Sequence, residues 1–104
     1  MIRKVKVVPY DPAWPEMFAR EADEIAEVFG PEVVAIHHIG STSIPNLCAK
    51  PIVDVLVEVR DIERVDDFDD EMTGRGYRPK GEFGITGRRF FIKGGDATRT
   101  HHVH

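Results

Sequence analysis

The chain has 104 residues, enough for one small domain with a modest hydrophobic core. Its formal net charge is −4, whereas nucleic-acid-binding domains typically carry an excess of positive charge, so a nucleic-acid partner is not expected. The single cysteine, Cys48, excludes an internal disulfide framework, and no apolar run is long enough for a signal peptide or a membrane span, so we expect a cytoplasmic protein without a membrane partner.

The first two expected elements are a strand and an amphipathic helix. Alternating polar and apolar residues predict a strand over residues 3–8, which a proline-rich segment then interrupts. The helix begins after Asp11 as its N-cap or, alternatively, at Pro15. Glu21 is assigned to the solvent-facing side of this helix. The opposite, apolar face recurs at steps of three or four residues and consists of Trp14, Phe18, Ala22, Ile25 and Phe29.

Strands and one further helix are expected in the rest of the chain. Residues 33–39 read as a strand, residues 40–43 as a polar turn, and residues 51–59 as the strongest strand, rich in β-branched residues. Residues 61–74 are spaced for a helix. Short strands are expected at 77–79, 88–93 and 99–104. This mixture predicts an α/β (α+β) domain, in which helices pack mainly on one face of a sheet.

The turn Gly40-Ser41-Thr42-Ser43 is a candidate phosphate-binding site. Its glycine lets the backbone approach a ligand closely, and its successive N–H groups and hydroxyls can hold an anion. The same residue types also build ordinary tight turns with a helix cap, so both interpretations stay open.

Three other residues are candidate phosphate contacts: His38 before the turn, Lys50 at the entrance of the next strand, and Arg89 on a late strand. Alternation places Arg89 on one face with Phe91 and Lys93, and this face could clamp a phosphate. Each candidate also has an ordinary interpretation, as a hydrogen-bonded histidine, a solvated lysine or an edge-strand charge.

A lone carboxylate, Asp54, interrupts the apolar run at residues 51–59. A carboxylate in such a place needs a partner, which could be an arginine or a divalent metal ion that bridges to phosphates. His102 and His104 are two residues apart, so they share one face of the last strand while His101 points away. If this strand lies beside Asp54, the three side chains form a metal site; otherwise the histidines belong to a solvated end segment.

Twelve residues separate Gly40-Ser41 from Asp54, and this spacing resembles the signature of the DNA-polymerase-beta-type nucleotidyltransferase superfamily. Four longer stretches resemble the GrpB family within it. They are YDPAWPEMF, HHIGSTSIPNL, AKPIVDVLVEV and RTHHVH. The resemblance implies a nucleotidyltransferase-like mixed sheet, a nucleotide or phosphorylated small molecule as partner, and a divalent metal. Magnesium or manganese is expected, with zinc as an alternative. It also implies that this single domain, residues 1–104, is truncated at its C-terminus relative to the family.

One departure from the superfamily pattern concerns the expected chemistry. The two-metal pattern requires a second acid at position 56, where this chain has Leu56. Asp54 is therefore the one candidate catalytic carboxylate, with Asp54, His102 and His104 as metal ligands. Three functions stay open: a metal-dependent nucleotidyltransferase, a non-catalytic nucleotide-binding module, and a single-metal phosphate hydrolase. The sequence leaves the oligomeric state open, a dimer included.

Overall fold

The structure, a computed structural model, describes residues 6–95 and 98–104. Its helices are α1 (Trp14–Phe29) and α2 (Asp69–Gly74). The short 3₁₀ helices are η1 (Gly30–Glu32), η2 (Ser41–Ser43) and η3 (Ile62–Phe68). The strands are β1 (Val33–Ile39), β2 (Val53–Val59), β3 (Tyr77–Pro79), β4 (Phe91–Gly94) and β5 (Arg99–Val103).

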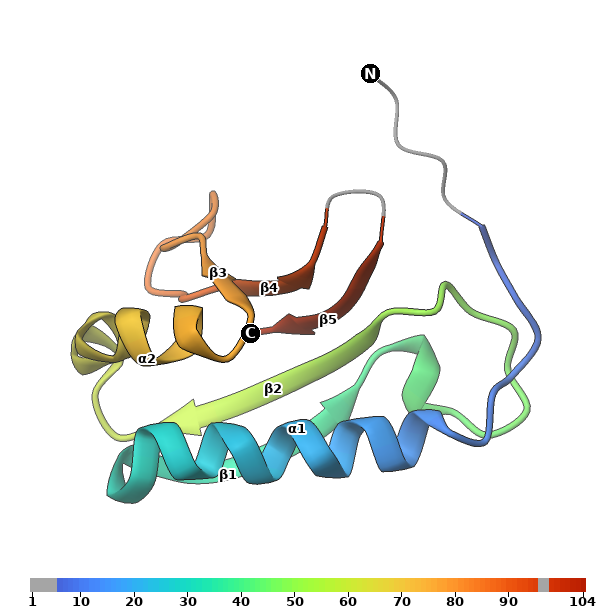
Figure 1. The fold of residues 1–104 in the computed structure, drawn as a ribbon, viewed down its shortest axis with the longest axis horizontal. Coiled ribbons are helices and arrows are strands. Elements are labelled where there is room, and N and C mark those ends of the chain that lie inside the picture. The colour runs from blue at the N-terminus through green and yellow to red at the C-terminus, as the bar shows by residue number, and fades with distance from the viewer. Residues whose placement is uncertain (1–5, 96–97) are drawn as a thin grey trace.

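The strands form a five-stranded mixed sheet in the order β1-β2-β5-β4-β3. The pair β2 and β5 is parallel, and the other neighbours are antiparallel. Figure 1 shows α1 running along β1 and β2, and α2 next to β3. The predicted α/β (α+β) class with a mixed sheet is therefore confirmed.

The helices pack on one face of the sheet, the covered face. The opposite face, called the open face, carries partly exposed Asp54 and His102 as well as buried Ile92. On β2, Val53 and Val55 are buried on the covered face, and alternation turns Asp54 to the open face. The core lies between the covered face and the helices. It includes Trp14, Ile25, Val28, Phe29, Val65, Met72, Tyr77, Phe91 and Val103. This arrangement confirms the expectation that the helices pack mainly on one face.

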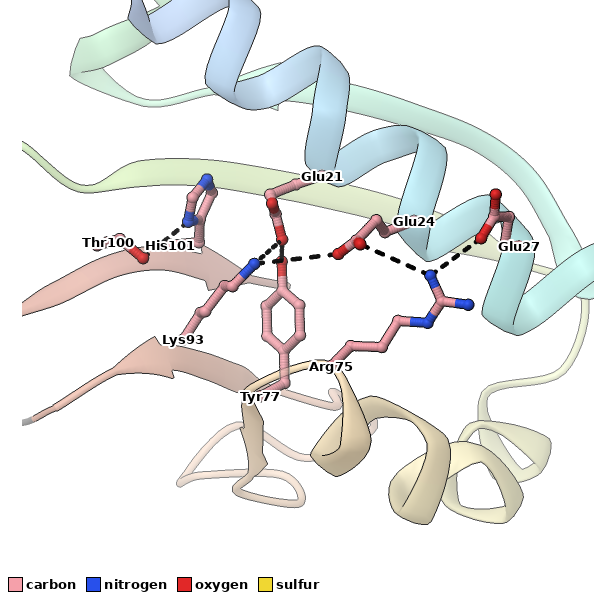
Figure 2. Close-up of polar contacts among 8 residues, drawn as sticks. All are labelled: Glu21, Glu24, Glu27, Arg75, Tyr77, Lys93, Thr100 and His101. Carbon is pink, nitrogen blue, oxygen red and sulfur yellow. Dashed lines mark hydrogen bonds and ion pairs between the residues drawn. The ribbon is translucent and has the colours of Figure 1, made fainter.

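A cluster of polar side chains lies inside the covered face (Figure 2). The Tyr77 hydroxyl and the Lys93 ammonium donate hydrogen bonds to Oε1 of Glu21 at 2.7 and 2.6 Å. Glu21 is only 8% exposed, so its assignment to the solvent side of the helix was wrong. Its position follows from β3 and β4, which bring Tyr77 and Lys93 under α1 and satisfy the buried carboxylate.

Two predicted elements differ from the structure. Of the expected strand at residues 3–8, residues 3–5 lie outside the described part, and Val8 forms only an isolated antiparallel bridge with Ala49. The expected helix over 61–74 is divided into η3 and the short α2. Among the described residues, no helix is both long enough and apolar enough to cross a membrane.

Candidate functional site

Asp54 lies in the middle of the sheet, where its backbone is flanked on both sides. It is paired with Ile39 of β1 and with His102 of β5. Because β2 and β5 are parallel neighbours in register, Asp54 and His102 project from adjacent strands on the same open face. The backbone ladder continues one residue further, since His104 N–H donates to the carbonyl of Val55 at 2.7 Å. His104 is thereby placed beside the same carboxylate.

The carboxylate of Asp54 and the two imidazoles form a compact cluster. Nε2 of His104 lies 3.2 Å from Oδ1 of Asp54, and Nδ1 of His102 lies 3.6 Å from the same oxygen. One potential ligand atom from each of the three residues lies within 4.8 Å of the others. The three side chains are partly buried, at 17–28% exposure, so the cluster is neither sealed nor fully solvated. The structure thus brings together the three residues that the sequence pattern indicated as metal ligands.

The imidazoles also set the charge state of Asp54. Burial raises the pKa of the carboxyl, but the hydrogen bonds and positive charge of His102 and His104 outweigh this effect and lower the pKa to about 2. Asp54 is therefore ionised at neutral pH and presents a negative charge on the open face. An ionised carboxylate next to imidazole nitrogens is a donor set that divalent transition metals accept.

Gly40 is packed directly against this carboxylate. A Cβ atom added at residue 40 would lie 2.6 Å from Oδ2 of Asp54, closer than real Cβ contacts. The backbone of Gly40 also has φ of +74°, in the left-handed region that favours glycine. Both observations require glycine at this position. The absence of a side chain at Gly40 lets the turn pack directly against Asp54 on the next strand, β2.

The three hydroxyl residues of the turn have different surroundings. Ser41 lines the pocket next to Asp54. Thr42 is buried and shares a 2.9 Å hydrogen bond with Nε2 of His38. The Ser43 hydroxyl donates to the carbonyl of Gly40 at 2.6 Å and stabilises the turn itself. Of the three hydroxyl residues in the predicted phosphate-binding turn, Ser41 is therefore the one that lines the pocket.

A pocket of about 160 Å³ opens between the turn and the cluster. Its lining consists of Ser41, Lys50, Ile52, Asp54 and His102. A lysine and a serine thus line the same space as a carboxylate and an imidazole. This combination can hold an anionic group and a cation at the same time, because each finds opposite charge or hydrogen-bond donors nearby.

The remaining two phosphate candidates lie elsewhere. His38 faces α1, where its ring stacks on Phe18 at 4.9 Å, and burial lowers its pKa while the Asp54 charge opposes the shift. Arg89 is held by Asp66, with Nε donating to Oδ1 at 2.8 Å, and it lines a separate apolar cavity on the covered face. The structure therefore places Arg89 beside Asp66 of η3 and does not bring it into the lining of the Asp54 pocket. His38 contacts the turn from the covered face, through its hydrogen bond with Thr42.

The sequence reasoning missed one residue of the open face. Phe90 packs its ring against His102 and His104, with centroid distances of 5.2 and 5.0 Å. Alternation along residues 88–93 places Phe90 on the face opposite Arg89, and this signal could have identified it. Leu56 lies two residues beyond Asp54 on the same face of β2 and is 37% exposed. An apolar side chain therefore stands where a second carboxylate would extend the cluster.

Comparisons with known proteins identify relatives of the whole chain. A family model described as "GrpB protein" matches residues 4–104. The chain is 60% identical over 102 residues to the UPF0157 protein YqkA of Bacillus subtilis, a match that covers 98% of this chain and 29% of that protein. The crystal structure of the conserved protein GrpB from Enterococcus faecalis aligns with a TM-score of 0.91 at 48% identity, covering 95% of this chain and 59% of that one.

A more distant similarity links the chain to an enzyme. It is 29% identical over 75 residues to the dephospho-CoA kinase of Mycobacterium tuberculosis, covering 69% of this chain and 18% of the kinase. In each of these comparisons the chain spans less than two thirds of its relative's length.

Proposed function

The chain belongs to the GrpB family, and from this premise we propose that its Asp54 pocket binds one divalent transition-metal ion together with the phosphate group of a nucleotide or phosphorylated small molecule. One observation carries the proposal: ligand atoms of Asp54, His102 and His104 lie within 4.8 Å of one another beside an open pocket. The proposal includes a cytoplasmic location, which agrees with the single, exposed Cys48.

The donor set favours some metals over others. Asp54 offers a carboxylate oxygen, and His102 and His104 offer imidazole nitrogens. Imidazole suits zinc, manganese and iron, whereas magnesium prefers an all-oxygen environment. Manganese or zinc is therefore the proposed ion in place of magnesium. The low pKa of Asp54, about 2, means that this carboxylate is ionised at neutral pH and needs to lose no proton before it binds a metal ion.

The phosphate group would be held by Lys50 and Ser41, which line the same pocket as two of the proposed metal ligands. Lys50 supplies positive charge and the Ser41 hydroxyl supplies a hydrogen-bond donor. The amides of Ser43 and Ile44 donate to carbonyls inside the turn, which leaves the amides of Ser41 and Thr42 as candidate donors. The similarity to dephospho-CoA kinase, an enzyme named for a nucleotide-like substrate, supports a nucleotide as the ligand.

The reaction that suits this site best is hydrolysis of a phosphate ester or anhydride. A bound ion would supply charge neutralisation and polarisation of a phosphoryl oxygen. Lys50 and Ser41 would orient the phosphate, and Asp54 would hold its negative charge towards the ion. Two-metal nucleotidyl transfer would need a second carboxylate near Asp54, and Leu56 stands in that place. Transfer of a nucleoside monophosphate is therefore the second candidate.

Calorimetric titration of untagged, chelator-treated protein with Mn²⁺ and Zn²⁺ tests the proposal. We expect one site per chain, and we expect Asp54→Asn to weaken binding at least tenfold, since it removes the charged ligand. Glu58→Gln is the matched control, because Glu58 pairs with His37 at 3.1 Å on an exposed part of the same strand. Wild-type protein without stoichiometric metal binding, or Asp54→Asn with wild-type affinity, would contradict the proposal.

Phosphorylated ligands are then added to the metal-loaded protein. Pyrophosphate and ADP should raise the melting temperature more with Mn²⁺ present than with chelator present, because ligand that binds only the folded state stabilises it. Release of inorganic phosphate would indicate hydrolysis. Transfer of a labelled nucleoside monophosphate to protein or another acceptor would instead favour the nucleotidyltransferase alternative.

A further inference from the structure

The open face continues beyond the metal cluster into aromatic side chains. In the order of the strands, Ser41 and Lys50 lie at one end, next to β2, and Asp54 and His102 lie on β2 and β5. Phe90, directly before β4, follows and contacts both histidines. The candidate metal ligands thus lie between the polar lining of the pocket and Phe90, which is itself only 4% exposed.

The outer part of this aromatic surface is Phe83, in the loop between β3 and β4. Its ring stacks on Phe90 with a centroid distance of 5.2 Å and an interplanar angle of 16°. Phe83 is nevertheless 54% exposed, so Phe90 covers only part of the ring and the rest is open to solvent. A phenylalanine that is half exposed in this way contributes little burial to the core.

The loop holds Phe83 in place through its own hydrogen bonds. Nη2 of Arg88 donates to the carbonyl of Phe83 at 2.9 Å, while the Arg88 guanidinium lies 4.7 Å from the centre of the Phe90 ring. The Gly87 amide donates to Glu82 at 2.7 Å and closes the loop further. Phe83 has φ of +46°, which is unfavourable for a bulky residue. The fold therefore maintains an exposed ring at a cost, which an ordinary surface loop would avoid.

We infer that Phe83, supported by Phe90 and Arg88, is a base-stacking subsite, and that the ligand of the Asp54 pocket is accordingly a nucleotide. The inference rests on the proposed function, because the phosphate end of the ligand would occupy the pocket of Ser41 and Lys50. Nucleobases stack on exposed aromatic rings with little dependence on base identity. A phosphorylated sugar without a base would use only the phosphate end.

Two probes that differ only in the base test this inference: AMP and ribose 5-phosphate, each titrated into Mn²⁺-loaded protein. Wild-type protein should bind AMP at least about fivefold more tightly, in line with the strength of base stacking. Phe83→Ala should abolish this preference and leave the affinities for ribose 5-phosphate and Mn²⁺ unchanged. Phe83→Trp should retain it. Ile85→Ala is the matched control, since Ile85 is equally exposed in the same loop and should have no effect.

The outcomes separate the inference from the proposed function. Equal affinity of wild-type protein for AMP and ribose 5-phosphate, or a preference that survives in Phe83→Ala, would overturn the stacking subsite and leave the metal and phosphate site intact. Loss of self-association in Phe83→Ala without any base preference in wild-type protein would assign the ring to a protein interface and overturn it too. Wild-type protein that binds neither Mn²⁺ nor ribose 5-phosphate would overturn both proposals.

Discussion

The two faces of the sheet carry similar chemistry in different surroundings. On the covered face, Glu21 is buried and its Oε1 accepts hydrogen bonds from Tyr77 and Lys93 (Figure 2). On the open face, Asp54 is partly exposed, and its partners are two imidazoles at the edge of a pocket. Strand β5 serves both faces, since His101 points inward and His102 points outward.

The contrast indicates which cluster is structural and which can bind a ligand. Burial raises the pKa of Glu21, but the hydrogen bonds from Lys93 and Tyr77 lower it by more, so the carboxylate stays charged with both donors at its Oε1 atom. The same carboxylate raises the pKa of Tyr77, as does burial. Asp54 has histidine partners that a metal ion can also use as ligands, and it has solvent access. A paired carboxylate without access stabilises the fold, whereas an accessible one can exchange its partner.

The largest effect on stability is expected from Glu21→Ala. This change leaves the Tyr77 hydroxyl and the Lys93 ammonium without their acceptor, and we expect a loss of about 3 kcal/mol in the free energy of unfolding. Urea denaturation measures it, and Mn²⁺ affinity should stay the same. Glu27→Ala is the control, because Glu27 pairs with Arg75 on the surface and should change stability by less than about 0.5 kcal/mol. A large loss of Mn²⁺ affinity in Glu21→Ala would contradict the assignment of a purely structural role to the cluster on the covered face.

Gly40→Ala should lower the free energy of unfolding by an intermediate amount and should strongly weaken Mn²⁺ binding at Asp54. The added Cβ would displace the Asp54 carboxylate and require an unfavourable φ, at an expected cost of about 2 kcal/mol and with loss of most Mn²⁺ affinity. Gly87→Ala separates the two causes, because Gly87 has a similar φ of +81° and a Cβ added there would meet no atom within 4 Å. Equal Mn²⁺ affinity in both variants would show that contact with Gly40 does not position Asp54.

The smallest effect concerns the pH dependence of the metal-free protein. The pKa of Asp54 is about 2 in the folded state, below its ordinary value of 3.8, so its ionised form stabilises the fold above pH 4. This contribution to the free energy of unfolding is lost as the pH falls from 4 towards 2, and we expect about 1 kcal/mol of it to be lost between pH 5 and pH 3. Denaturation of wild-type and Asp54→Asn protein at both pH values measures the difference. Equal pH dependence of the two proteins would show that the imidazoles do not stabilise the carboxylate.

Apolar runs and the alternation of side chains predicted much of the fold, because both reflect which residues along the chain are buried. The apolar run of β1 has the boundaries expected from sequence, Val33–Ile39, and alternation correctly separated His101 from His102 and His104. The burial of Glu21 could not be predicted in this way, because its partners Tyr77 and Lys93 lie 56 and 72 residues further along the chain. Their approach depends on which strands α1 crosses, and helix periodicity carries no such information.

The site shows the same division between local and distant information. Alternation correctly grouped Arg89 with Phe91, but it could not tell which face the helices would cover, so it could not show that Arg89 lies apart from the Asp54 pocket. The proximity of Asp54 to the histidines required the parallel pairing of β2 with β5, which the periodicity did not predict and the sequence left open. The contact between Gly40 and Asp54 is likewise a tertiary one.

The interior position of β5 has a consequence for the kinetics of any ion held there. Hydrogen bonds to β2 and β4 fix both edges of the strand, so fraying cannot separate His102 from Asp54. Ion uptake and release would then proceed through side-chain rotation, which takes nanoseconds, and not through opening of the sheet. Amide protons of β5 should accordingly exchange with solvent only on global unfolding, even while the ion comes and goes rapidly.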